Sequence, residues 1–116
     1  MNFKTHNQKY VRIDGTSLQG YIITEYNTLK KAFGKPNNGD KYKIDAEWDI
    51  EFDDGLVATV YNWKDGKAYL GADGTPKTKI VDWHIGGKSQ EAVVRVIEIL
   101  EALKWARCTV SQGLAI

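Results

Sequence analysis

The sequence has little of what would indicate a disulfide framework, a metal site built from thiolates, or binding through bulk charge. It holds 2 prolines and a single cysteine, Cys108, and its 16 Lys+Arg against 15 Asp+Glu leave a net charge of +1. One cysteine excludes an internal disulfide and a thiolate zinc site, and it fits a reducing compartment. The charge balance argues against nucleic-acid binding by bulk charge and against an acidic DNA mimic, but it allows a local basic patch.

Long apolar runs are also missing. The longest nearly apolar stretch is about half of the ~20 residues that cross a bilayer, and residues 1–4 show no signal-peptide pattern. The 116 residues are 42% hydrophobic and 27% charged, which suits one folded domain over residues 1–116. No repeat or low-complexity segment divides the chain. We therefore expect a single intracellular domain without a membrane span.

The strongest local pattern is a strict alternation of apolar and charged residues over residues 42–52. It predicts a strand with one buried face and one wet, acidic face. The acidic face consists of Asp45, Glu47, Asp49 and Glu51. Residues 53–55 then predict a tight turn, and residues 56–63 the returning strand. A two-residue loop at Asp54-Gly55 would place Phe52 opposite Val57, Ile50 opposite Thr59, Trp48 opposite Tyr61 and Ala46 opposite Trp63.

The other elements are predicted from weaker signals. We expect a short strand at 10–13, an irregular turn or bulged strand at 14–20, and a helix over 24–33 between Thr24 as N-cap and Gly34 as stop. Residues 64–77 predict a long, mobile connection, and residues 79–85 a third strand. A long helix capped by Ser89 and running to about residue 107 follows, and we expect the tail over 108–116 to dock or pair.

The expected fold is therefore an α+β domain with the element order β-α-β-β-β-α. Its antiparallel sheet has about three to five strands, and two helices pack mainly on one face.

The segment from Asp82 to Ser89 is the first candidate site. A strand runs into Gly86 and Gly87, then into Lys88 and a helix start, so backbone N–H groups, the helix N-terminus and an ammonium could meet an anion there. The end of this segment matches a phosphate-binding P-loop, but Asp82 stands where that loop needs its first glycine. We therefore exclude a nucleotide hydrolase and keep two interpretations open, an anion contact or an ordinary strand-to-helix turn.

Two further segments carry ligand-binding chemistry. Thr16, Ser17 and Gln19 lie between glycines, which suits an adaptable hydrogen-bonding loop as well as a plain turn. Trp63 ends a strand and is followed by Lys64, so a ring and a cation could hold a nucleotide-like ligand, although a core role is the alternative.

Catalytic and metal chemistry have less support. The acidic strand face with Asp82 and His84 could hold a divalent metal, but alternating charge on a strand is more often a solvated surface. An acid-x-lysine nuclease triplet fails because Asn62 stands at the acid position before Trp63 and Lys64. Cys108 has no histidine near it in sequence and is interpreted as an inert small hydrophobe. We therefore expect no catalytic residue, no metal and no cofactor.

Several strings resemble a group of small proteins encoded by tailed bacteriophages. They are Gly15-Thr-Ser-Leu-Gln-Gly-Tyr-Ile22, Phe33-Gly-Lys-Pro36, Glu47-Trp48, Val57-Ala-Thr-Val-Tyr-Asn-Trp-Lys64 and Trp83-His-Ile-Gly-Gly87. The resemblance covers roughly residues 14–100 and departs from the pattern at Asn62, where the group has an acid. It implies a phage accessory protein in the host cytoplasm, and small phage proteins outside the virion commonly block host defences.

Two functions follow from this resemblance. One is a non-enzymatic sponge that sequesters a phosphate-bearing nucleotide-type molecule, with a pocket shared across a homodimer. The alternative is an inhibitor that binds a host defence protein, as anti-CRISPR proteins do, through the acidic strand face or the 64–77 connection. The ligand-binding residues expected for the first function are Thr16, Ser17, Gln19, Trp63, Lys64, Trp83, His84, Gly86, Gly87, Lys88 and Ser89.

Overall fold

A computed structural model describes the backbone of residues 2–115 and the side chains of residues 2–103. The strands are β1 (Phe3–Thr5), β2 (Ser17–Ile23), β3 (Glu47–Phe52), β4 (Val57–Tyr61) and β5 (Asp82–Gly87). The helices are α1 (Tyr26–Phe33), the short α2 (Lys67–Leu70) and α3 (Glu91–Ala115), with two 3₁₀ turns at Gly71–Asp73 and Lys77–Lys79. This confirms the predicted α+β class.

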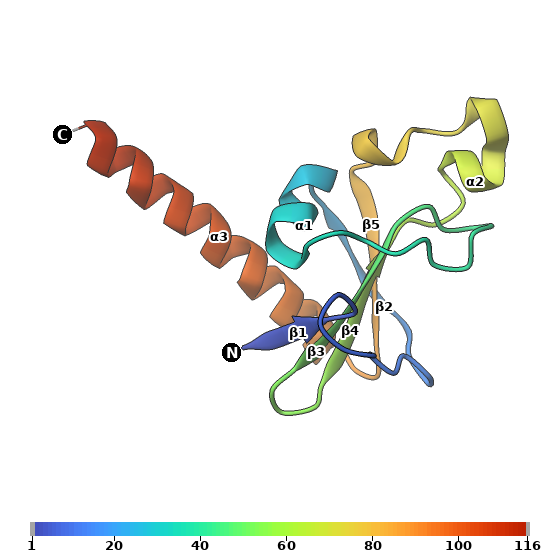
Figure 1. Cartoon of the computed structure of the whole chain (residues 1–116), viewed down its shortest axis with the longest axis horizontal. Coiled ribbons are helices and arrows are strands. Elements are labelled where there is room, and N and C mark those ends of the chain that lie inside the picture. Colours follow the sequence, from blue (N-terminus) through green and yellow to red (C-terminus); the bar gives the residue numbers. More distant parts are fainter. Residues whose placement is uncertain (1, 116) are drawn as a thin grey trace.

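The five strands form one antiparallel sheet in the order β1-β3-β4-β5-β2. Helices α1 and α3 lie on the same side of it, and α3 crosses the strands and extends beyond the sheet (Figure 1). Fully buried Trp48, Ile50, Val60, Trp83 and Ile85 form the core between the sheet and these helices. We call the opposite face of the sheet the outer face.

The β3–β4 hairpin has a different register from the predicted one. Trp48 faces Val60 and Glu47 faces Tyr61, because the loop holds three residues, with Phe52 N–H donating to Leu56 O and Gly55 at φ +91°. Three-residue loops that end in a left-handed glycine are a common hairpin type. A shift of one residue moves every side chain of a strand to the other face. Tyr61 therefore lies on the outer face and not in the core.

The alternation over residues 42–52 also forms less strand than predicted, because β3 begins only at Glu47. Asp40 Oδ1 accepts the backbone N–H groups of Tyr42, Lys43 and Ile44 at 2.8–3.1 Å. These bonds curl the chain into a bend, and they compete with strand pairing. They also hold the pKa of Asp40 below its usual value against the opposing effect of burial.

Other boundaries differ as well. Residues 10–13 form no strand, and β2 occupies the predicted irregular segment, with the bulge between Leu18 and Gly20. Helix α1 begins at Tyr26 without a side-chain cap, so Thr24 does not cap it, while Gly34 ends it as predicted. The connection over 64–77 is structured, since it carries α2, a 3₁₀ turn and a bridge between Gly66 and Thr75.

Helix α3 begins at Glu91, two residues after the predicted cap Ser89. Its backbone is helical to Ala115, so the tail over 108–115 continues the helix. Whether this tail docks depends on side chains from residue 104 onward, which lie outside the described residues, as does the predicted inert role of Cys108.

Candidate functional site

Four aromatic rings gather on the outer face. Tyr61 pairs with His84 across β4 and β5, and Tyr21 pairs with His84 across β2 and β5. The His84 ring centroid lies 4.8 Å from that of Tyr21, 5.5 Å from that of Tyr61 and 6.5 Å from that of Trp63. We call Tyr21, Tyr61, Trp63 and His84 the aromatic platform. Tyr21 is 66% exposed and Trp63 38% exposed, so a ligand can reach both rings.

Two lysines flank the Trp63 ring. Lys43 Nζ lies 5.5 Å and Lys64 Nζ 5.7 Å from the ring centroid, within the range of cation–π attraction. The backbone N–H of Lys64 donates to Lys43 O at 2.8 Å, which keeps the two residues side by side. Lys64 has φ +61°, a left-handed conformation that costs a non-glycine residue on the order of 1 kcal/mol. Strain of this kind persists where the surroundings enforce it, and it is enriched at binding sites.

The side chain of Asn62 fixes the chain just before these groups. Asn62 is fully buried, and its Oδ1 accepts the N–H groups of Asp45 at 2.7 Å and Ala46 at 3.1 Å. Its Nδ2 donates to carboxylate oxygens of Asp45 at 2.9 Å and Asp65 at 3.0 Å. Asn62 therefore ties the end of β4 to both flanking loops and sets the position of Trp63. The sequence indicated Asn62 only as the residue that replaces the acid of a nuclease triplet, and it gave no signal for this structural role.

His84 forms the centre of the aromatic platform. Burial lowers its pKa below the usual value, and the charge of Asp65 opposes this shift. A lowered pKa keeps the imidazole neutral at pH 7. A neutral ring offers a planar surface for stacking together with one hydrogen-bond donor and one acceptor.

The acidic strand face is not the solvated surface that alternation predicts. Glu47 is 7% and Asp49 8% exposed, and residues 6–14 cover part of this face, with Lys9 bonded to Glu51 and Val11 buried (Figure 1). Burial is the largest cause that raises the pKa of Glu47 to about 9, and the neighbouring Asp49 is the second. Asp49 Oδ1 has no hydrogen-bond partner among the described residues, and a proton on the neighbouring Glu47 would offer this carboxylate a donor. These two residues therefore present no acidic surface to a partner.

Glu47→Gln is expected to stabilise the protein increasingly as the pH rises. Between about pH 4.5 and 9 the folded state keeps the proton of Glu47 and the unfolded state releases it, so the free energy of unfolding of the unchanged protein falls with pH. The fall is at most about 1.4 kcal/mol per pH unit. Glutamine keeps a donor toward Asp49 and removes the titration. Urea unfolding at pH 5 and pH 8 should show the variant gaining at least about 1 kcal/mol over the unchanged protein between these two pH values.

Glu51→Gln is the matched control for this measurement. It makes the same chemical change on the same strand face, but it removes the ion pair with Lys9. A stability difference for Glu47→Gln that stays constant with pH, or that also appears for Glu51→Gln, would contradict a protonated Glu47.

The structure divides the predicted ligand-binding residues between the two ends of β5. Trp63 and Lys64 lie beside His84, near its beginning, as described above. The second group lies at the other end, about 10 Å farther along the strand by its usual rise. This group comprises Thr16, Ser17, Gln19, Gly86, Gly87, Lys88 and Ser89. The two predicted loops are therefore neighbours, but the eleven residues do not line one pocket.

Much of the second group is committed to the fold. Ser17 pairs with Gly87, Gln19 Nε2 donates to Gly87 O at 3.0 Å, and Thr16 Oγ1 donates to Ile13 O at 2.7 Å. A Cβ on Gly86 would lie 2.5 Å from Thr59 Oγ1, and one on Gly87 2.5 Å from Ala92 Cβ. Gly86 thus allows the side chain of Thr59 on β4 to lie close, and Gly87 allows the start of α3 to pack on the sheet. Lys88 and Ser89 are exposed.

Trp83 belongs to the core and not to a ligand site. It is 0% exposed, its ring contacts those of Tyr26 and Trp48, and its Nε1–H donates to Thr24 O at 3.0 Å. Its position on the core face of β5 follows from the alternation with His84. His84 is therefore accessible from the outer face, and Trp83 is not.

Within the described part of the chain, no three His, Cys, Asp or Glu side chains come close enough together to hold a metal ion. None of the described helices has both the length and the apolar composition needed to cross a membrane. No protein-family model and no curated protein matches the chain. The geometry of the outer face is therefore the basis for a functional hypothesis.

Proposed function

We propose that this chain binds a small nucleotide-type molecule on the aromatic platform without converting it chemically. The carrying observation is the partly exposed Trp63 ring with Lys43 and Lys64 held at its faces. Any nucleobase can stack on an aromatic ring, because every base has a π face. Phosphate groups pair with ammonium groups. The base would contact Trp63 and the neutral His84, and the phosphates would meet the two lysines.

The biological use that we propose is sequestration of a nucleotide signal, which is one of the two functions that the resemblance to phage proteins implies. A protein acting in this way in the host cytoplasm needs affinity and no turnover. The alternative, an inhibitor of a host defence protein, loses one of its two predicted docking surfaces, because Glu47 and Asp49 of the acidic strand face are buried. Its other predicted surface, the 64–77 connection, is exposed over residues 67–73.

A thermal-shift screen tests the binding. The panel holds cyclic oligonucleotides, cyclic ADP-ribose isomers and NAD. A ligand at about 100 times its dissociation constant adds about 2.7 kcal/mol to the free energy of unfolding, which raises the melting temperature by several degrees. The ligand should be recovered unchanged after incubation. A panel without any shift would contradict the proposal and would favour the protein-binding alternative.

Affinity measured by calorimetry on variants then locates the site. Trp63→Ala is expected to weaken binding by about tenfold or more, since stacking contributes about 1–3 kcal/mol per base. Lys64→Gly removes the ammonium group and suits the left-handed backbone, so it should lose affinity without losing stability. Lys30→Ala, on the exposed side of α1, is the matched charge control and should leave affinity within about twofold.

Lys88→Ala distinguishes the platform from the other end of β5. If Lys88→Ala abolishes binding while Trp63→Ala leaves it intact, the ligand lies on the Gly86–Gly87 turn and the proposed site is wrong.

A further inference from the structure

Strand β2 leaves one edge of the sheet open. No residue in the described backbone pairs with its outer side, and its seven residues include neither a charge nor a proline. The opposite edge of the sheet, formed by β1, is protected. Strand β1 is three residues long and carries Lys4, and beyond it His6 and Asn37 continue the backbone pairing with β3. Proteins normally shorten, charge or cover their edge strands, and an unprotected one is a template for pairing with another chain.

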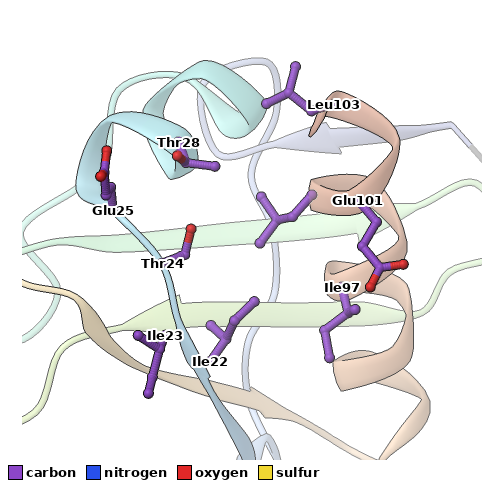
Figure 2. Close-up of a pocket in the computed structure, with 9 residues that line it drawn as sticks. Ile22, Ile23, Thr24, Glu25, Thr28, Ile97, Glu101 and Leu103 are labelled. Atoms are coloured by element: carbon purple, nitrogen blue, oxygen red, sulfur yellow. The ribbon is translucent and has the colours of Figure 1, made fainter. Parts of the chain in front are cut away.

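A largely apolar groove lies at the Ile23 end of this open edge. It has a volume of about 640 Å³ and lies between β2, the start of α1 and α3 (Figure 2). Ile22 lines it from the strand and Ile97 from the helix (Figure 2), and the buried Leu100 also lines it. Exposed apolar side chains extend the surface, with Ile23 79% and Val94 45% exposed. A partner that pairs with β2 would therefore also cover apolar area on α3.

The charges at the two ends of β2 are opposite. At the Ile23 end, Glu25 and Glu101 stand at the rim of the groove. At the Ser17 end stands Lys88, whose Cε lies 3.6 Å from where a Cβ on Gly15 would be. Asp14 beside Gly15 is paired with Arg12 at 3.1 Å, so Lys88 leaves this end with a positive sum. Helix α3 also begins at that end of β2, and the N-terminus of a helix carries a positive partial charge.

We infer that the partner is a second copy of this chain, with the two β2 strands paired antiparallel about a two-fold axis. Antiparallel pairing sets the acidic end of one copy against the basic end of the other, twice, as a two-fold interface requires. A strand without charge of its own can also pair with itself without repulsion between like residues. The two five-stranded sheets then form one continuous sheet.

The dimer places both ligand sites on one surface. Tyr21 lies on β2, on the outer face, between His84 and the open edge. Pairing of two β2 strands brings the two aromatic platforms to the same face on either side of the seam. The pairing itself does not depend on any ligand, so it stands or falls separately from the proposed function.

Sedimentation velocity over a concentration series tests the inference on the full chain. We expect a species of twice the monomer mass. Ile23→Lys should weaken the dimer at least tenfold, because it removes an apolar contact and sets a new ammonium group toward Lys88 of the other copy. Tyr10→Lys is the matched control, since Tyr10 is also 79% exposed but lies outside β2, and it should leave the dimer unchanged.

A charge exchange tests the orientation. Glu101→Lys and Lys88→Glu should each weaken the dimer, and the double variant should restore it, because each new charge then meets the opposite charge of the other copy. A monomer at every concentration would overturn the inference. A dimer that survives Ile23→Lys, or a double variant no tighter than the single ones, would place the interface elsewhere or in another orientation.

Discussion

Asn62→Leu is expected to lower the free energy of unfolding by roughly 2–4 kcal/mol. Leucine has the same branched shape and is somewhat larger, so the change opens no cavity and the loss comes mainly from hydrogen bonds. The change leaves the N–H groups of Asp45 and Ala46 without their acceptor, and the carboxylates of Asp45 and Asp65 without a shared donor. A buried group without a partner costs about 1–3 kcal/mol, while the net gain from an ordinary hydrogen bond is smaller.

Denaturant unfolding followed by circular dichroism measures this loss. Asn37→Leu is a useful control, because Asn37 is half-buried and makes two side-chain bonds where Asn62 makes four. Its Nδ2 donates to Asp49 Oδ2 at 3.0 Å, and its Oδ1 accepts the backbone N–H of Gly39 at 2.8 Å. It should lose clearly less stability than Asn62→Leu. Equal losses would mean that Asn62 does not hold the strand end and its loops together in the way described above.

Trp83→Ala is expected to cost about 3–5 kcal/mol, the usual loss for a large buried aromatic residue. Trp83 is fully buried against Trp48 and Tyr26, at the contact between β5 and the helices. A loss of this size is a large part of the 5–15 kcal/mol that stabilises a typical domain. The variant should therefore unfold at a clearly lower temperature and a lower urea concentration than the unchanged protein, as calorimetry and urea unfolding would show.

Trp63→Ala makes the same substitution at a tryptophan outside the core, and its effect on stability is to be compared with that of Trp83→Ala. Its ring is 38% exposed and lies on the outer face, so its removal should cost stability clearly less than that of Trp83. The two tryptophans thus separate folding from binding, since Trp83→Phe should retain affinity where Trp63→Ala loses it. A Trp63→Ala variant as unstable as Trp83→Ala would show that Trp63 supports the core.

The sequence predicts the fold class well and the strand register poorly, and the reason is local. Alternation identifies β3 and its buried side from Trp48, Ile50 and Phe52. It does not specify whether the turn at residues 53–55 uses two or three residues, and this choice decides which face carries Tyr61. Strand β3 starts at Glu47 and not at residue 42, because the side chain of Asp40 accepts the backbone N–H groups of residues 42–44.

Part of the candidate site is also predictable. A tryptophan followed by a lysine at a strand end indicates a ring beside a cation, and Trp63 and Lys64 have that arrangement. Tyr21 could not be assigned to the same place, because only the sheet order brings β2 beside His84. Lys43 could not be assigned there either, because it comes from the bend before β3, which a backbone bond to Lys64 holds beside Trp63. The glycine pair at 86–87 resembled an anion-binding turn because close packing and anion binding require the same small residues.

A two-dimensional amide NMR titration with the nucleotide panel tests the central claim most directly. Binding on the aromatic platform predicts the largest chemical-shift changes at the Trp63 indole N–H and at the backbone amides of Tyr21, Lys64 and His84. Changes confined to residues 15–17 and 88–89 at the other end of β5, or spectra that no nucleotide alters, would contradict it.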